Sequence, residues 1–318
     1  MRFLLATGVL ASLVLARPPA VAPPRPLLEV ARFRALDQTR PTAEIEVNIT
    51  VPTQGLLYRQ RIRRAFQASA TLELSLTRAD GGQPVWRETV ALRPPVLTDT
   101  ARTIKNPFSL LRRVLVPDGA YVLRAALRDD MRPTSEPKRT VVVEQPVEAL
   151  APTGVAFSDV LLLGQPAARV AAGEGDNVRG GYQLTRAPTG LYARGADVVF
   201  FYAELSGLPA GRPVRLRYRL ASGAPETPAT PAAPAAPANK ASALKPAAAE
   251  ATLTALPGRP TPVVGRLPLG ALPAGPFTLT LEARDATTNK LLASQRQTGS
   301  RNPTDYIQAG ASSPGARP

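Results

Sequence analysis

The sequence predicts an all-β protein of two tandem immunoglobulin-like β-sandwich domains, with a Pro/Ala-rich disordered loop inserted in the second. Three observations lead to this fold class. Several segments alternate apolar and polar residues, the same patterns recur in the second half, and a proline-rich tract follows one of the recurring strands. The 318 residues are enough for two domains, each with its own core.

Three strand patterns define the first unit. Residues 44–51, EIEVNITV, place Ile and Val at alternate positions, the period of a half-buried strand. Residues 66–76, FQASATLELSL, follow the same period, and the glycines of ADGGQ then supply a turn into the return strand VWRETVAL. The third pattern, VPDGAYVLRAALRDD at 116–130, is a turn feeding a strand. A helical residue period competes with the strand period only in the Ala-rich stretch near 241–251.

Each pattern has a counterpart later in the chain, in the same order. VPDGAYVLRAALRDD resembles LPAGPFTLTLEARDA at 272–286. AEIEVNI at 43–49 resembles ADVVFFY at 196–202, and LELSL at 72–76 resembles LRYRL at 216–220. Three matches in one order predict two copies of one sandwich-like domain.

These patterns divide the chain into consecutive parts. They are a signal peptide at 1–16, a Pro-rich leader at 17–27, β-sandwich domain 1 at 28–147, a connector at 148–154, β-sandwich domain 2 at 155–300 with the inserted loop at 224–250, and a flexible C-terminal tail at 301–318.

The N-terminus, MRFLLATGVLASLVLARPP, has the features of an export signal. Arg2 gives a positive n-region, and Phe3 to Leu15 form an apolar stretch too short to span a membrane as a mature helix. A buried N-terminal helix is the structural alternative. The chain has no cysteine for lipid attachment, and no later segment is apolar for long enough to span a membrane. We therefore expect an exported protein, periplasmic or at the cell surface, that is not a lipoprotein.

The proline-rich segment PETPATPAAPAAPANK begins at Pro225, and its prolines recur every third residue. It follows LRYRL, whose counterpart LELSL precedes the tight ADGGQ turn. We therefore predict that it occupies a hairpin connection within domain 2, which is tolerated because loop-closure entropy grows only slowly with length. A polyproline II helix with this period could serve a proline-recognising groove. A solvated spacer is the favoured interpretation.

Composition excludes several classes of active site. The chain has no His and no Cys, which removes Ser-His-Asp and Cys-His nucleophiles and the usual zinc and copper sites. No Asp-rich loop has the spacing of a calcium site, so no cofactor is expected. The formal net charge of +15 suits a polyanion-binding surface. Compositional drift toward Ala, Pro, Gly and Arg is the favoured explanation, because the charges are scattered along the chain.

The stretch LLYRQRIRR concentrates this charge. If it is extended, Arg59, Arg61 and Arg63 project from one face with Arg64 nearby. Arginine forks match the geometry of phosphate and carboxylate groups, so these four residues are the candidate contact for an anionic partner. A solvated hairpin tip that discourages edge-to-edge pairing is the favoured interpretation of this segment.

Four other residues have structural interpretations that are favoured over functional ones. Trp86, the only tryptophan, shares a strand face with Val90 and Leu92 and is expected in the core rather than on a sugar-binding surface. Asp129 and Asp285 occupy matching strand ends and are expected to cap turns or pair with arginines rather than to do acid–base chemistry. Asn48 begins an N-glycosylation pattern that lies mid-strand, which argues against its use.

The order of these segments, from AEIEVNI through VPDGAYVLRAALRDD to VAFSDVLLLG and DVVFFYAEL, resembles the N-terminal region of the GWxTD-domain proteins. The resemblance covers about residues 28–300 and implies an exported bacterial protein with tandem β-sandwiches. Gly-Trp-x-Thr-Asp itself does not occur, since Trp86 is preceded by Val85 and followed by Arg87, and the family's helical C-terminal domain is missing. The resemblance therefore implies a shortened relative, with no activity to carry over.

Three functions are compatible with these patterns. The favoured one is an exported non-enzymatic interaction or scaffolding protein of the bacterial cell envelope, whose partner is another envelope protein. The alternative is a glycan- or polyanion-binding module that uses its Arg-rich surface on anionic glycans or lipid headgroups. Nucleic acid is not an expected partner. An enzyme is the least favoured, because the chain lacks histidine.

Overall fold

A computed structural model describes residues 23–35, 42–100, 106–136, 139–150, 153–171, 175, 177–223, 247–270 and 272–303. Within these ranges the regular structure is β-strand apart from a short 3₁₀ helix at Pro188–Gly190, so the all-β prediction is confirmed. The predicted signal peptide, most of the leader, most of the proline insertion and nearly all of the predicted tail lie outside them.

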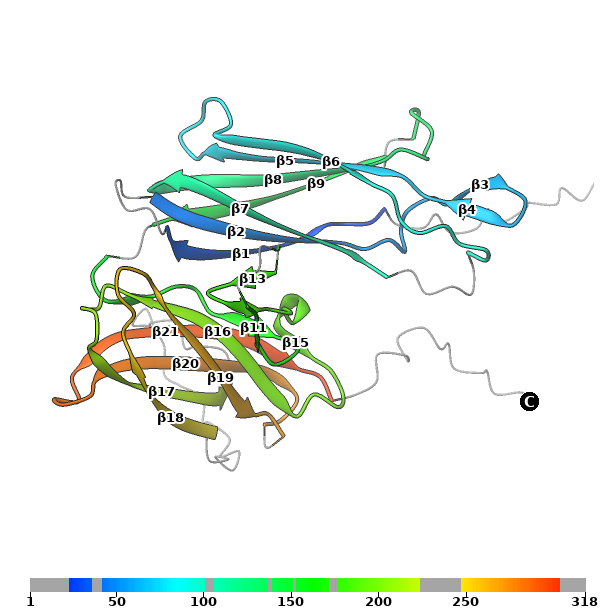
Figure 1. Cartoon of the computed structure of the whole chain (residues 1–318). Helices are drawn as coiled ribbons and strands as arrows, with labels where there is room; N and C mark the ends of the chain where they lie inside the picture. Colours follow the sequence, from blue (N-terminus) through cyan, green and yellow to red (C-terminus); the bar gives the residue numbers. More distant parts are fainter. Residues whose placement is uncertain are drawn as a thin grey trace, which may run out of the picture.

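The first sandwich packs two antiparallel sheets face to face (Figure 1). One sheet has the order β1 (Leu27–Arg34), β2 (Thr42–Val51), β7 (Phe108–Pro117); the other has the order β6 (Trp86–Leu92), β5 (Ala70–Arg78), β8 (Gly119–Asp129), β9 (Thr140–Ala149). Most of the alternating residues identified in the sequence fill the space between them. This core includes Ile45, Val47, Ile49, Leu72, Leu74, Leu76, Tyr121, Leu123 and Leu127. The pattern predicted at 66–76 is not one strand, because Ala65–Gln67 belongs to a separate hairpin and β5 begins at Ala70.

The second sandwich follows β9, which extends to Ala149 and therefore into the predicted connector of 148–154. Its first sheet is built on β16 (Val198–Ser206), which pairs with β10 (Ala156–Phe157) and β11 (Leu161–Leu163) on one side and β19 (Thr261–Pro268) on the other. Its second sheet has the order β15 (Leu191–Tyr192), β21 (Leu291–Arg301), β20 (Gly275–Asp285), β17 (Pro213–Ser222), β18 (Ala247–Thr254). A small sheet of β12 (Ala168–Arg169), β14 (Tyr182–Gln183) and β13 (Val178–Arg179) lies beside it.

Strand order supports the internal repeat. The run β6-β5-β8-β9 of the first sandwich corresponds to β18-β17-β20-β21 of the second. The register agrees as well: Leu72 lies opposite Leu127, and Leu216, its counterpart, lies opposite Ala283, the counterpart of Leu127. The short sequence matches therefore mark strands with the same place and pairing in both halves.

The strands on either side of the proline-rich segment are neighbours in one sheet. β17 and β18 pair antiparallel from Pro213 opposite Thr254 to Leu220 opposite Ala247, so the segment joins two strands of one hairpin. The strand β18 starts within the predicted insertion of 224–250, and it occupies part of the stretch that has a helical period. Pairing with β17 outweighs the helix propensity of alanine here.

Two local predictions in the first hairpin agree with the structure. Gly81 and Gly82, in the turn between β5 and β6, have φ values of 97° and 101°, a conformation that favours glycine. Trp86 starts the return strand, lies opposite Leu76 and packs half-buried against the core. It is therefore a packing residue.

Candidate functional site

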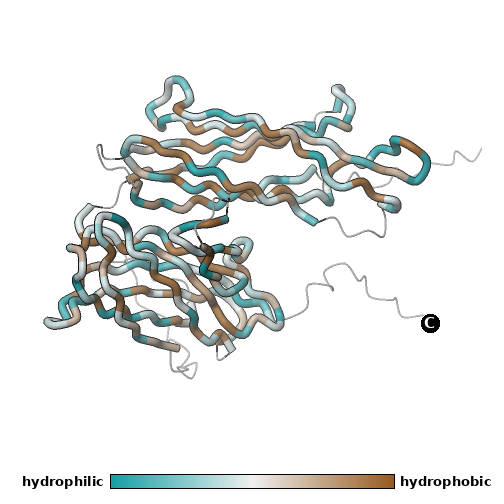
Figure 2. The backbone as a smooth tube through the Cα atoms, in the orientation of Figure 1, coloured by the Kyte–Doolittle hydropathy of each residue, from teal (hydrophilic) through white to brown (hydrophobic). Residues whose placement is uncertain are grey.

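The two sandwiches contact each other through the outer face of the β1–β2 sheet (Figure 1). Ala31 and Phe33 of β1 form an apolar cluster with residues of the second sandwich. We call this cluster, together with the polar contacts described next, the junction. The partners in the second sandwich are Leu161, Leu163, Leu184 and Tyr202, all buried. Figure 2 shows apolar residues on both sides of this contact.

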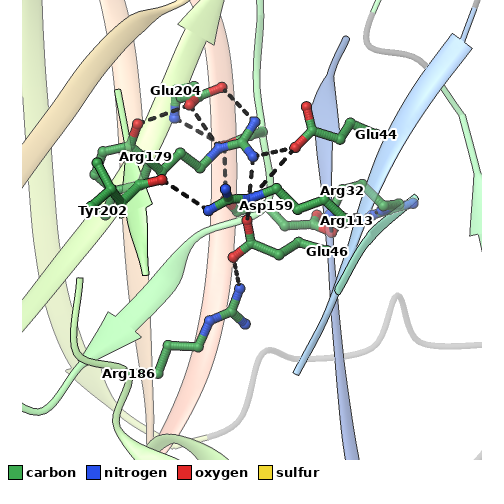
Figure 3. A network of polar contacts seen from close by, with 11 residues as sticks. Arg32, Glu44, Glu46, Arg113, Asp159, Arg179, Arg186, Tyr202 and Glu204 are labelled. Atoms are coloured by element: carbon green, nitrogen blue, oxygen red, sulfur yellow. Dashed lines mark hydrogen bonds and ion pairs between the residues drawn. The ribbon is translucent and has the colours of Figure 1, made fainter. Parts of the chain in front are cut away.

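Arg179 is the centre of the junction's polar part (Figure 3). Its Nη1 donates to Glu44 Oε1 at 2.5 Å and Glu46 Oε2 at 3.3 Å, and its Nε donates to Glu204 Oε1 at 2.8 Å. The guanidinium also lies 3.5 Å from the centre of the Phe33 ring, a cation–π contact. Arg179 thus joins β2 of the first sandwich to β16 of the second.

The turn that presents Arg179 depends on glycine. Gly180 has a φ of 56°, and a Cβ at this position would clash with the hydroxyl of Tyr202. That hydroxyl donates to Glu204 Oε1 at 2.8 Å, which fixes the carboxylate that accepts from Arg179. The glycine therefore allows the turn and Tyr202 to approach the same carboxylate.

Glu46 is the most deeply buried carboxylate of the network, with 1% of its surface exposed. It accepts hydrogen bonds from Arg113 at 3.1 Å and from Arg179, and it forms an ion pair with Arg186. With Glu44 and Glu204, the network contains three carboxylates and three guanidinium groups. The three negative and three positive charges balance. Buried charges need partners of opposite sign, because an unpaired charge away from water is costly.

The surroundings of Glu46 shift its acidity. Burial by itself would raise the pKa of Glu46, but the charges of Arg186, Arg179 and Arg113 outweigh it and hold the pKa below its ordinary value of 4.5. A carboxyl group with a lowered folded-state pKa stabilises the fold above its unfolded pKa. That stabilisation is lost as the pH falls through the folded pKa.

We expect Glu46→Gln to lower the free energy of unfolding at neutral pH. The difference from the wild-type protein should shrink below a pH of about 4.5, as Glu46 itself becomes protonated. Urea unfolding followed between about pH 6 and pH 3 measures it. A difference that stays constant over this range would show that the charge of Glu46 does not stabilise the folded state.

A groove of about 570 Å³ opens beside the junction, and several of the polar side chains that line it already pair with one another or with the backbone. Arg32 and Asp159 form a two-pronged ion pair at 2.9 and 3.0 Å, and Gln295 donates to Asp159 Oδ1 at 3.3 Å. Glu29 accepts from the backbone N–H of Thr189 at 2.5 Å. The described lining contains no aromatic ring on which a sugar could stack. These contacts add to the attachment between the sandwiches.

The four candidate arginines lie on a different part of the first sandwich, in a hairpin of β3 (Arg59–Ile62) and β4 (Ala65–Gln67). This unit, residues 59–67, is the arginine hairpin; it projects at one end of the sandwich (Figure 1). Backbone hydrogen bonds of 2.8 Å in both directions between Phe66 and Leu97 anchor its base. All four arginines are exposed, and no salt bridge to any of them occurs in the described ranges.

The arrangement along the hairpin differs from the extended one considered from sequence. Ile62 lies opposite Ala65, so Arg63 and Arg64 form the two-residue turn instead of continuing the strand. Arg64 has a φ of 60°, and the register shifts between Gln60 and Ile62. The bulge and the turn therefore break the alternation that would have placed three arginines on one face.

The two matching aspartates cap turns, as the sequence indicated. Asp129 accepts hydrogen bonds from the N–H of Met131 at 3.0 Å and from Leu57 at 2.8 Å, and pairs with Arg132 at 3.2 Å. Asp285 accepts from the N–H groups of Thr287 at 3.0 Å and Thr288 at 2.8 Å and pairs with Arg212. The hydrogen bond from Thr288, followed by the pairing with Arg212, lowers the pKa of Asp285.

The glycosylation pattern lies mid-strand, as expected. Asn48 is 9% exposed and donates from Nδ2 to Glu29 at 2.8 Å. The described residues include no helix long and apolar enough to cross a membrane. They also include no group of three or more Asp or Glu side chains placed to hold a metal ion.

No protein-family model matches the chain, and no curated protein matches it. Among solved structures it is similar to red sea bream transglutaminase, with 10% identity and a TM-score of 0.23 over 86% of this chain and 31% of that one. A tetra-tandem repeat from the extending region of a large adhesion protein has 14% identity and a TM-score of 0.23 over 88% and 50%. An adhesin from Mobiluncus mulieris that contains disulfide, isopeptide and ester cross-links has 10% identity and a TM-score of 0.23 over 81% and 80%.

The chain thus spans about a third of the first of these structures and half of the second. TM-scores at this level give no information about function. The fold is defined by the strand order and register of the chain itself.

The junction was not predicted, whereas the arginine hairpin was. The sequence around Arg179 is rich in glycine and predicts only a turn. The pattern around Glu44 and Glu46 predicts that both side chains lie on the polar face of a half-buried strand. One signal was available: two glutamates at alternate positions on a strand leave closely spaced negative charge that must be solvated or paired. This signal does not identify the arginines that pair with Glu44 and Glu46.

Proposed function

We propose that this chain is an exported, non-enzymatic interaction protein of the bacterial cell envelope that uses the arginine hairpin to bind an anionic partner. The observation that carries the proposal is the exposure of Arg59, Arg61, Arg63 and Arg64 on one projecting hairpin, without a salt bridge to the described residues. Elsewhere many arginines pair with carboxylates, for example Arg112 with Glu88 at 2.7 Å. The hairpin's charge is therefore available to another molecule.

Composition supports the other parts of the proposal. The apolar stretch after Arg2 supports export to the periplasm or cell surface, and the segment order that resembles the GWxTD-domain proteins supports the same location. The lack of His and Cys supports a role without nucleophilic catalysis.

A scaffolding role is the second candidate, and the junction favours it. The apolar cluster and the network around Arg179 connect the two sandwiches. A rigid pair of domains can hold bound partners at a fixed separation. In this role the junction sets the geometry and the arginine hairpin is one of its contact surfaces.

We expect replacement of Arg59, Arg61 and Arg63 with Gln to weaken binding to heparin, a soluble polyanion. Each lost contact should reduce the slope of log affinity against log salt concentration by about one. Titration at several salt concentrations measures both effects. The matched control changes three exposed arginines elsewhere, Arg87, Arg259 and Arg296, to Gln, with the same loss of net charge.

The control variant should keep most of the affinity and most of the salt slope. Equal losses in both triple variants would show that overall charge, and not the hairpin, determines binding. No binding of heparin or of anionic vesicles by the wild-type protein would contradict the proposed function and return the hairpin to the role of a solvated tip.

A further inference from the structure

The tip of the arginine hairpin also carries an apolar side chain that the charges do not explain. Ile62 is 72% exposed, more than any other of the large exposed hydrophobic residues of the described chain. Single exposed apolar residues are common on protein surfaces. This one immediately precedes the turn formed by Arg63 and Arg64, so an apolar side chain and four cationic ones occupy the same projecting tip.

We propose that the arginine hairpin docks on an anionic lipid surface, with Ile62 entering the layer between headgroups and acyl chains and the four arginines binding lipid phosphates. This inference rests on the proposed function and names its partner. Segments that bind at a membrane interface combine cationic residues with an apolar group that is buried by about 5–10 Å. Arginine suits phosphate because its planar fork donates two parallel hydrogen bonds.

The backbone of the hairpin suits this environment. Arg59 pairs with Gln67, Gln60 with Phe66, and Ile62 with Ala65, so much of the tip's backbone is already hydrogen-bonded. Unpaired N–H and C=O groups would be costly where water is scarce. The base is held by the hydrogen bonds between Phe66 and Leu97, so the tip is presented on a fixed support.

A soluble anionic glycan fits the same arginines less completely. It would neutralise their charge but leave Ile62 in water, because a hydrated polysaccharide offers little apolar surface. A lipid surface accommodates both kinds of side chain at once. This difference makes Ile62 the residue that separates the two partners experimentally.

The test compares vesicles of pure phosphatidylcholine, vesicles that also contain phosphatidylglycerol, and heparin, each titrated against the full chain. We expect binding to the anionic vesicles and little to the neutral ones. Ile62→Ser should weaken binding to anionic vesicles about tenfold and leave heparin affinity unchanged. Changing all four arginines to Gln should weaken vesicle binding by about fivefold for each arginine. Every variant keeps the predicted signal peptide at 1–16, so differences between variants report on the hairpin.

Leu115→Ser is the matched control. Leu115 is 62% exposed and lies on β7, opposite Glu44 of β2. The arginine hairpin follows the other end of β2, which ends at Val51, so Leu115 is at the end of the sheet away from the hairpin. It should leave vesicle binding unchanged. A second readout is the tryptophan fluorescence of Ile62→Trp in a Trp86→Phe background, which should shift to shorter wavelength only with anionic vesicles.

The outcomes separate this inference from the proposed function. Binding to heparin but not to anionic vesicles would overturn the lipid assignment and leave an anionic partner in place. Equal losses for Ile62→Ser and Leu115→Ser, or no fluorescence shift, would overturn the entry of Ile62 into the bilayer. Failure to bind either heparin or anionic vesicles would overturn both proposals.

Discussion

Replacing Arg179 with Ala is expected to lower the free energy of unfolding by about 3–5 kcal/mol. Within the described part of the chain, the variant would leave Glu204 without an arginine partner and would remove one partner each from Glu44 and Glu46. Glu46 and Glu204 are buried, so water cannot replace the lost guanidinium without opening the junction. The loss of the contact with the Phe33 ring adds to the effect.

Denaturant unfolding of the two proteins measures this loss. Arg124→Ala is the control, because Arg124 pairs with Glu144 at 3.4 Å on the surface, where side chains are 45% and 58% exposed. Such pairs contribute at most about 1 kcal/mol, so this variant should remain close to wild type. If Arg179→Ala is equally mild, the network does not hold the junction together.

Dividing the chain within the proline-rich segment is expected to abolish folding of the second sandwich. A break between Gly223 and Ala247 separates β17 from both of its neighbours, β18 and β20. The fragment ending at Gly223 would also lack β19, the partner of β16. Neither piece then contains the set of strands that encloses the second core. Thermal unfolding of each fragment should show no cooperative transition from this sandwich.

The complementary variant keeps the chain whole and replaces residues 224–246 with an Asp-Gly-Gly turn. The strands β17 and β18 would then be joined as β5 and β6 are joined in the first sandwich. Closing a shorter loop costs less entropy, so stability should be unchanged or higher by about 1–2 kcal/mol. Independent, reversible melting of the two fragments, or unfolding of the shortened chain, would contradict the arrangement in which one core spans the segment.

Local periodicity was enough to predict several of the core strands, although β1, β7, β9 and β21 were not among them. Ile45, Val47 and Ile49 alternate along β2 and lie in the first core, because a strand turns successive side chains to opposite faces. Recurrence of the patterns then indicated which strands correspond, and the structure pairs Leu72 and Leu216 in equivalent registers. Both predictions depend only on neighbouring residues and on comparison of one half with the other.

The charge pattern of the sequence predicted where the arginine hairpin lies, but not how its residues are arranged. The run of arginines predicted an exposed element, and Arg59 and Arg61 are exposed. The positions of Arg63 and Arg64 in the turn depend on the register in which β3 meets β4, which the charge pattern does not specify.

By itself the sequence determined the all-β class, the alternating cores and the internal repeat, since each follows from local side-chain order. Only the tertiary structure decided what lies against the polar face of β2. Glu46 alternates with core residues and would face water on an isolated sandwich, yet Arg179 and Arg186 of the second sandwich enclose it. The partner of a charged side chain is set by the packing of segments far apart in the chain, and a local pattern contains no information about that packing.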